Sequence, residues 1–226
     1  MTNKIVPSYE MLQKGQEDSF AYIKFFATAR INNFTLELCG GNSLSLQNYQ
    51  ILVNAANENL ILGGGIAGEI RNRAGNEVEE ECKAFLLQNN LTHLESGQIC
   101  TTLTYNLKNF AYIFHTVGPR VENNRVTDQN KLDLFNSVQA CISHAIQNNL
   151  NSIVIPAISC GIFGYPLKEA VEIHYNALFS QANSFPLNEF RVCFCLFKKV
   201  ELREFYEHLR NKFTSFDSVQ FFEDNA

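Results

Sequence analysis

Short apolar runs alternate along the chain with longer segments whose apolar residues recur every three or four positions. The short runs are rich in β-branched and aromatic residues and are typical of strands, some of them apolar enough to be buried on both faces of a sheet. The predicted strands are 20–31, 34–39, 50–54, 98–103, 110–116, 152–157 and 190–197. The predicted helices are 66–73, 76–89, 128–148, 166–182 and 200–212.

Local signals mark some of the helix ends. Gly75 stops the first helix, and Asn76 with Glu79 three residues later has the pattern of an N-cap with a capping box. Pro166 suits the first turn of the fourth helix.

Strands that alternate with helices predict an α/β layered fold with a largely parallel sheet, to which the strands within 20–39 add an antiparallel edge. We expect one domain over 20–213, a polar extension over 1–19 and a tail over 214–226. Ligands of such sheets bind beyond the carboxyl ends of the strands, so the segments 54–70 and 156–166 are the places to search.

Composition narrows the classes of function. With 46% apolar residues in 226, the chain can bury a core, and its net charge of −5 argues against a basic nucleic-acid surface. No apolar run reaches the roughly 18 residues of a membrane helix, and the N-terminus lacks a secretory pattern. The seven cysteines form no CxxC pair, which predicts reduced, buried thiols, no metal site and a cytoplasmic or nucleocytoplasmic protein.

Two turns carry the candidate chemistry. The first runs from Asn54 through the triplet Gly63-Gly64-Gly65 to Gly68, and the second is PAISCGIFGYP over 156–166. Each lies between a buried strand and a helix, where glycine lets the backbone approach a ligand and the helix N-terminus attracts an anion. Neither contains Lys or Arg, so a phosphate bound there would be held by backbone amides. The alternative is that both are tight turns without a ligand.

Known phosphate motifs fit these turns poorly. There is no GxxxxGK[ST] pattern, and no GxGxxG motif with a later ribose-binding acid. Other residues invite functional roles that have simpler explanations. His115 is expected to be a structural histidine, Cys193 and Cys195 to share one core-facing strand face, and Cys160 to be a small filler rather than a nucleophile.

The segments VNAANENLILGGGIAGEI (53–70), HTVGP (115–119) and PAISCGIFGYP (156–166) together resemble the macrodomain family of ADP-ribose-binding proteins. The resemblance spans about 36–210. It implies a three-layer α/β/α sandwich with a mixed sheet of six or seven strands and ADP-ribose bound at the strand ends. No cofactor is implied, and a monomer is expected.

Carried over by position, the resemblance implies specific roles. Asn57 would hold the distal ribose and, with Gly65, carry the reaction. The serine-containing turn would wrap the diphosphate, and Phe197 would either stack on adenine or belong to the core. The implied ligand-binding residues are Asn42, Ser43, Ala55, Asn57, Gly64, Gly65, Ile66, Ala67, Ala157, Ser159, Cys160, Gly161, Ile162, Phe163, Gly164 and Phe197.

Three positions depart from the family pattern. Asn42 stands where members usually have an Asp that accepts from the adenine amino group, so the charge assistance is lost. Ala67 stands where many cellular hydrolases have an acid, which makes GGGIAG similar to viral members. Leu62 precedes the glycines where others have His or Gly, which could alter access to the distal ribose.

The leading hypothesis is hydrolysis of mono-ADP-ribosyl groups from proteins, or deacetylation of O-acetyl-ADP-ribose. A module that binds ADP-ribose without turnover is the alternative, and an ADP-ribose-1″-phosphate phosphatase is a further one. No paired carboxylates occur in the turns, where Glu58 and Glu69 are the acids, and Glu69 is most simply a partner of the helix dipole. Catalysis would then rest mainly on positioning.

Overall fold

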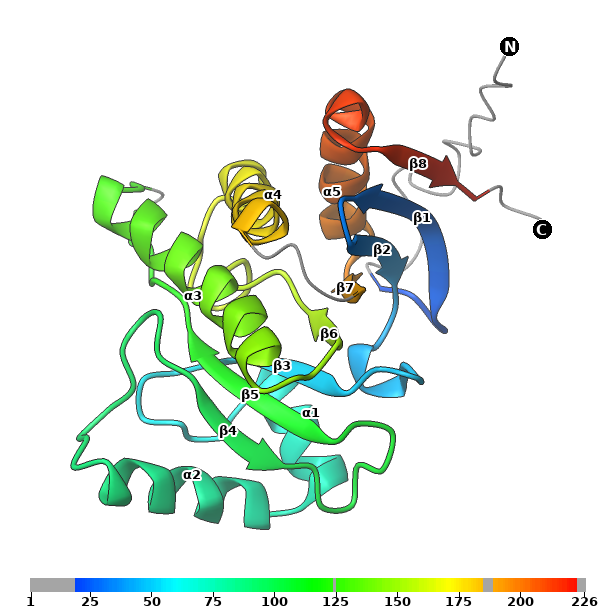
Figure 1. Ribbon diagram of the computed structural model, residues 1–226. Helices are drawn as coiled ribbons and strands as arrows, with labels where there is room; N and C mark the ends of the chain where they lie inside the picture. The colour runs from blue at the N-terminus through cyan, green and yellow to red at the C-terminus, as the bar shows by residue number, and fades with distance from the viewer. Residues whose placement is uncertain (1–18, 124, 185–188, 223–226) are drawn as a thin grey trace.

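A computed structural model describes residues 19–123, 125–184 and 189–222 (Figure 1). The strands are β1 (Lys24–Ile31), β2 (Phe34–Gly40), β3 (Ile51–Ala56), β4 (Cys100–Leu103), β5 (Tyr112–Val117), β6 (Ser152–Ile155), β7 (Phe190–Leu196) and β8 (Ser218–Phe221). The α-helices are α1 (Gly65–Ala74), α2 (Glu77–Gln88), α3 (Asp128–Gln147), α4 (Leu167–Ser184) and α5 (Lys199–Asn211).

All eight described strands form one mixed sheet in the order β4-β5-β3-β6-β7-β2-β1-β8. The five strands β5, β3, β6, β7 and β2 are parallel, and β4, β1 and β8 add antiparallel edges. The predicted α/β fold with a largely parallel sheet is therefore confirmed. Because the five central strands share one direction, their carboxyl ends meet along one edge of the sheet.

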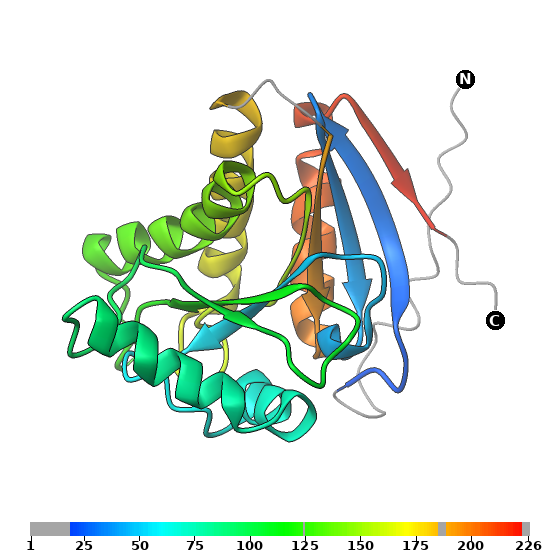
Figure 2. The same ribbon diagram turned by 60° about the horizontal axis from the view of Figure 1, so that its bottom comes forward.

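Helices cover both faces of the sheet, with α1 and α2 on one side and α3, α4 and α5 on the other (Figures 1 and 2). Strand periodicity divides the core between these layers. On β3, Ile51 and Val53 belong to the cluster beneath α3–α5, whereas Leu52 belongs to the cluster beneath α1. Cys193 and Cys195 share the second face, as the i, i+2 spacing predicts.

The chain end departs from the predicted tail. Residues Ser218–Phe221 form β8, which pairs antiparallel with β1 so that Val219 lies opposite Ala29 and Phe221 opposite Ala27. Val219 and Phe221 pack against the core, so burial of alternate side chains and pairing with an open edge hold the segment. The sheet consequently has eight strands rather than six or seven. The predicted extension over 1–19 lies outside the described residues except for Ser19, which bridges to Lys198.

The predicted capping box of α2 is wrong. The Asn76 side chain makes no cap; its Oδ1 accepts from Arg71 Nε at 3.1 Å. Glu79 instead accepts from the N–H of Leu62 at 3.0 Å and from Lys83 Nζ at 2.9 Å. Glu79 therefore holds the loop before the glycine triplet rather than its own helix end.

Candidate ligand-binding cleft

A cleft of about 1010 Å³ opens at the carboxyl ends of the five parallel strands. Each of these strands contributes the segment that follows it: 41–44 after β2, 57–67 after β3, Gly118 and Arg120 after β5, 156–163 after β6, and 197–201 after β7. We call 57–67 the glycine turn and 156–165 the serine turn. The strand direction brings them together although about a hundred residues separate them.

The glycine turn presents backbone N–H groups to the cleft. Gly64 is the N-cap of α1, and the N–H groups of the first three helical residues have no intrahelical acceptor. Gly63 N–H, by contrast, donates to Ile61 O at 3.0 Å, and Gly68 N–H to Gly64 O at 3.3 Å. Among the described residues, the amides of 64–67 therefore have no partner, and they all line the cleft. Gly65 has a φ of 58°, a left-handed conformation that favours glycine.

In the serine turn, too, some backbone N–H groups have an acceptor within the protein and others have none. Four N–H groups are satisfied within the protein: Ile158 by His174 Nε2, Cys160 by Ala157 O, Gly164 by Gly161 O and Tyr165 by Ser159 O. The N–H groups of Ala157, Ser159, Gly161, Ile162 and Phe163 have no acceptor in the described structure, and all five residues line the cleft. Buried or cleft-facing amides usually find a partner, so this set indicates a ligand with several acceptor oxygens.

Ser159 adds a hydroxyl to these amides. The residue lines the cleft and is 5% exposed, and its buried Oγ has no hydrogen-bond partner among the described residues. The residue has a φ of 65°, an uncommon conformation for serine. An unpartnered, buried hydroxyl in a strained turn is typical of a binding site rather than of a passive loop.

His174, on α4, supports the serine turn from below. It is fully buried, its Nδ1–H donates to Ala170 O at 2.7 Å, and its Nε2 accepts the Ile158 N–H at 3.2 Å. Burial lowers the pKa of His174 to about 4, so the ring is neutral and can accept. The histidine therefore fixes the first residues of the turn.

Asn57, predicted to be catalytic, lines the cleft but is engaged in its own turn. Its Nδ2 donates to Ile61 O at 2.6 Å, and its Oδ1 accepts from Ile61 N–H at 3.1 Å. One amide hydrogen and one oxygen lone pair remain for a ligand. Asn57 therefore shapes the glycine turn in addition to any contact with a ligand.

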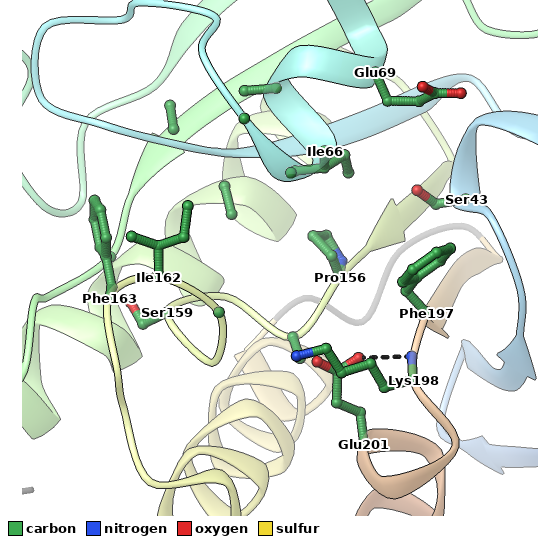
Figure 3. A pocket seen from close by; sticks show the side chains of 18 of the residues that line it. Ser43, Ile66, Glu69, Pro156, Ser159, Ile162, Phe163, Phe197, Lys198 and Glu201 are labelled. Carbon is green, nitrogen blue, oxygen red and sulfur yellow. Dashed lines mark hydrogen bonds between the residues drawn. The ribbon is translucent and has the colours of Figure 1, made fainter. Parts of the chain in front are cut away.

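An aromatic side chain forms the other end of the cleft. Phe197 is 53% exposed and lines the cleft on the side opposite Phe163 and Ile162 (Figure 3). Phe197 is therefore not a core residue, so the alternative that it belongs to the core is wrong. Asn42 lies at the same end, where its Oδ1 accepts from Leu44 N–H at 3.0 Å and caps a short 3-10 helix over Ser43–Ser45.

Four charged side chains line the cleft. Arg120 lies over the ring of Phe163 at 4.3 Å and has no carboxylate partner in the described part of the chain. Glu69 lies in the second turn of α1, not the first, and pairs with Arg73 at 2.8 Å. At the aromatic end, Glu201 Oε2 accepts from Lys198 N–H at 3.1 Å. Burial raises the pKa of Glu201 above its ordinary value.

All but two of the predicted site residues line this cleft. Those that do are Asn42, Ser43, Ala55, Asn57, Gly64, Gly65, Ile66, Ala67, Ala157, Ser159, Gly161, Ile162, Phe163 and Phe197. Cys160 and Gly164 do not. Cys160 packs against the core, and its N–H donates to Ala157 O at 3.2 Å. Gly164 has a φ of 68° and turns the chain toward α4.

The structure also shows the surroundings of three further residues that the sequence analysis considered. Burial raises the pKa of the Cys160 thiol, and Cys160 does not line the cleft, which fits a small filler better than a nucleophile. His115 is buried between Asn54 Nδ2 and Thr102 Oγ1, each at 3.0 Å, and is structural as predicted. Leu62 is buried in the core beneath α1 and does not reach the cleft. No group of three metal-binding side chains occurs in the described residues.

Several lining residues were not predicted. Leu44, Gly118, Arg120, Pro156, Cys195 and Lys198 all lie at or just beyond strand ends, so the rule that selected the two turns would have found them if applied to every strand. Glu201 lies a helical turn further on, and no sequence signal marks it.

Comparison with known proteins identifies the family. The Macro domain family matches residues 53–174, more than half of the chain. This protein belongs to the Macro domain family. The macrodomain is 30% identical over 213 residues to human ADP-ribose glycohydrolase MACROD2, covering 92% of this chain and 47% of that protein. It thus spans about half the length of that relative.

A shorter relative and two solved structures are similar to the same chain. Macro domain-containing protein XAC3343 of Xanthomonas axonopodis pv. citri is 41% identical over 123 residues, covering 54% of this chain and 67% of that protein. An Oceanobacillus iheyensis macrodomain solved with ADP has a TM-score of 0.77 at 27% identity, covering 86% of this chain and all of that one. A Trypanosoma brucei macrodomain in complex with ADP-ribose has a TM-score of 0.66 at 27% identity, covering 77% and 68%.

Proposed function

We propose that this macrodomain binds ADP-ribose and hydrolyses mono-ADP-ribosyl groups from modified proteins. The observation that supports it is the set of unpartnered N–H groups that belong to cleft-lining residues of both turns, 64–67 in the glycine turn and 157, 159 and 161–163 in the serine turn, with the buried, unpartnered Ser159 hydroxyl beside them. A diphosphate offers acceptor oxygens enough for such a set. The similar proteins named ADP-ribose glycohydrolase support the same ligand.

In the proposed pose the diphosphate lies between the glycine turn and the serine turn. The adenine lies against Phe197, where stacking contributes about 1–3 kcal/mol. The distal ribose lies against Asn57 and Gly65, beside Phe163. Asn42 Oδ1 already accepts from Leu44 N–H, so its second lone pair or its amide hydrogens remain for the base.

The proposed reaction needs few groups from the protein. A water oxygen forms a bond to C1″ of the distal ribose, and the bond from C1″ to the carboxyl oxygen of the modified Glu or Asp side chain breaks. The water loses a proton, which passes to the released carboxylate or to the solvent. Glu69 is paired with Arg73, and Glu58 is exposed and does not line the cleft, so neither is placed as a general base. Positioning of ribose and water by the turns then supplies the rate enhancement.

A non-catalytic ADP-ribose reader is the second candidate. Ala67, at the position where many hydrolases have an acid, offers no proton acceptor to water, and this favours binding without turnover. Deacetylation of O-acetyl-ADP-ribose and hydrolysis of ADP-ribose-1″-phosphate use the same pose and remain alternatives to be assayed.

Calorimetry with ADP-ribose, followed by hydrolysis assays on Glu/Asp-linked and Ser-linked substrates, tests the proposal. We expect binding and release of ADP-ribose, with hydrolysis at least about tenfold slower in Asn57→Ala. Asn59→Ala is the matched control, because Asn59 is an exposed residue of the same turn that does not line the cleft. Tight binding without product would support the reader, and undiminished hydrolysis by Asn57→Ala would overturn the role of Asn57.

We further propose a cytoplasmic or nucleocytoplasmic location, which the seven unpaired cysteines support. No helix in the described ranges has both the length and the apolar character that a membrane crossing requires.

A further inference from the structure

Glu201 is a carboxylate in a cleft that we propose for a dianionic ligand. It lies in the first turn of α5 and its side chain lines the cleft below Pro156 (Figure 3). Its Oε2 accepts the backbone N–H of Lys198 at 3.1 Å. A carboxylate has about four acceptor sites, so most of its capacity remains for a ligand that can donate hydrogen bonds.

Two neighbours place this carboxylate along the cleft. Its anchor, Lys198, directly follows Phe197, the aromatic end of the cleft. On the other side is the serine turn, whose residues Ser159, Ile162 and Phe163 lie across the cleft from Phe197 (Figure 3). Glu201 thus lies between the proposed adenine site and the proposed diphosphate site.

The part of ADP-ribose that joins adenine to diphosphate is the adenosine-side ribose. Its 2′- and 3′-hydroxyls are hydrogen-bond donors, and a carboxylate is the usual partner of such a pair in nucleotide-binding folds. A phosphate in place of the 2′-hydroxyl would bring like charges together in a partly buried site, which disfavours binding.

We propose that Glu201 binds the adenosine-side ribose hydroxyls and excludes ligands phosphorylated on that ribose. The inference rests on the proposed function and deepens it. The substrate class becomes ADP-ribosyl groups derived from NAD, and 2′-phospho-ADP-ribose, the NADP-derived counterpart, is rejected.

Lys198 provides the opposing possibility. Its side chain also lines the cleft and is exposed, and an ammonium group there would attract a 2′-phosphate. If Lys198 determined selectivity, the wild type would accept the phosphorylated ligand and Lys198→Gln would lose it. Control by Glu201 and control by Lys198 therefore lead to opposite expectations for binding of the 2′-phosphorylated ligand.

The test is calorimetry with ADP-ribose, 2′-phospho-ADP-ribose and 2′-deoxy-ADP-ribose on the full chain. The wild type is expected to bind ADP-ribose at least about 30-fold more tightly than the phosphorylated ligand, and Glu201→Gln to reduce that ratio at least about tenfold. Loss of the 2′-hydroxyl is expected to weaken binding to the wild type more than to Glu201→Gln. The Gln variant keeps an acceptor for Lys198 N–H and hence the helix cap.

Glu204→Gln is the matched control, because it removes the same charge from the same helix at a position that does not line the cleft. It is expected to leave the ratio unchanged. The role of Glu201 would be overturned if ADP-ribose binds and the wild type and Glu201→Gln show the same ratio of affinities for ADP-ribose and 2′-phospho-ADP-ribose. The same conclusion would follow if removal of the 2′-hydroxyl weakens binding equally in both proteins. Absence of ADP-ribose binding in every variant would instead overturn the proposed function.

Discussion

Replacement of Gly118 by alanine should displace residues of the serine turn, although Gly118 itself follows β5. A Cβ at Gly118 would overlap Ser159 Oγ and lie 2.6 Å from Ile158 Cγ2. The backbone of neither neighbour can withdraw easily, because Ile158 N–H is bonded to His174 and Ser159 O accepts from Tyr165 N–H at 3.0 Å, so the Ser159 hydroxyl must rotate away from its position. The substitution therefore forces atoms into a packed region.

The magnitude follows from the overlap. Overpacking of this kind costs about 1–3 kcal/mol of unfolding free energy, or roughly 2–12 °C in Tm for a chain of this size. Displacement of Ser159 also removes a hydroxyl that we expect to donate to a charged phosphate oxygen. Such a bond is worth about 1.5–3 kcal/mol, so the affinity for ADP-ribose should fall about 10- to 100-fold.

Gly64→Ala is the matched comparison. A Cβ there meets no atom within 4 Å, and Gly64 has a φ of −130°, which alanine adopts without strain. The unfolding free energy should therefore change by no more than about 0.5 kcal/mol. Because the new methyl group lies in the cleft, the affinity for ADP-ribose should still fall at least about tenfold.

Differential scanning calorimetry and titration calorimetry on the two variants check both effects. We expect reduced stability and affinity in Gly118→Ala, and reduced affinity alone in Gly64→Ala. A destabilised Gly118→Ala that binds ADP-ribose as tightly as the wild type would refute the link between Gly118, Ser159 and the ligand. Wild-type affinity in Gly64→Ala would refute the place of the ligand beside the glycine turn.

Further predictions concern single groups around the same cleft. Ser159→Ala should weaken ADP-ribose binding about tenfold in titration calorimetry without loss of Tm, since the hydroxyl has no partner in the protein. Arg120→Gln should change that affinity less than about threefold, because backbone amides rather than this exposed cation hold the diphosphate. The folded pKa of His174, about 4, lies below its unfolded value near 6.5, so the unfolded state binds the proton first. Its contribution to stability is therefore complete above pH 6.5 and is lost as pH falls toward 4, by about 3 kcal/mol, and denaturant unfolding should show a shallower pH slope in His174→Gln.

The order of strands and helices could be predicted because each element is governed by local patterning. The run 50–54 is short, apolar and followed by a glycine-rich segment, which is typical of a buried strand, and its end marks where a ligand can bind. The edge strand β8 could not be predicted in this way. Its pairing with β1 depends on an open sheet edge that only the folded chain supplies.

The two turns were accessible to sequence analysis for the same reason, and the details of the cleft were not. Which amides lack an acceptor depends on contacts across the fold, such as His174 with Ile158 and Glu79 with Leu62. The need for glycine at 118 depends on Ser159, more than forty residues away. Such requirements belong to the packing of one segment on another and leave no local trace.

The charged side chains of the cleft do not explain how an acidic protein would bind the proposed dianion. Arg120 and Lys198 bring two positive charges to the wall, and Glu69 and Glu201 bring two negative charges, so these side chains together supply no net attraction. The protein as a whole has a charge of −5, which repels an anion at long range. Attraction must therefore arise at short range, from the amide sets of the two turns and the N-terminus of α1. Because fixed dipoles act on a ligand only when it is seated between the turns, they favour the diphosphate in one pose and leave Glu201 free for its proposed role toward the ribose.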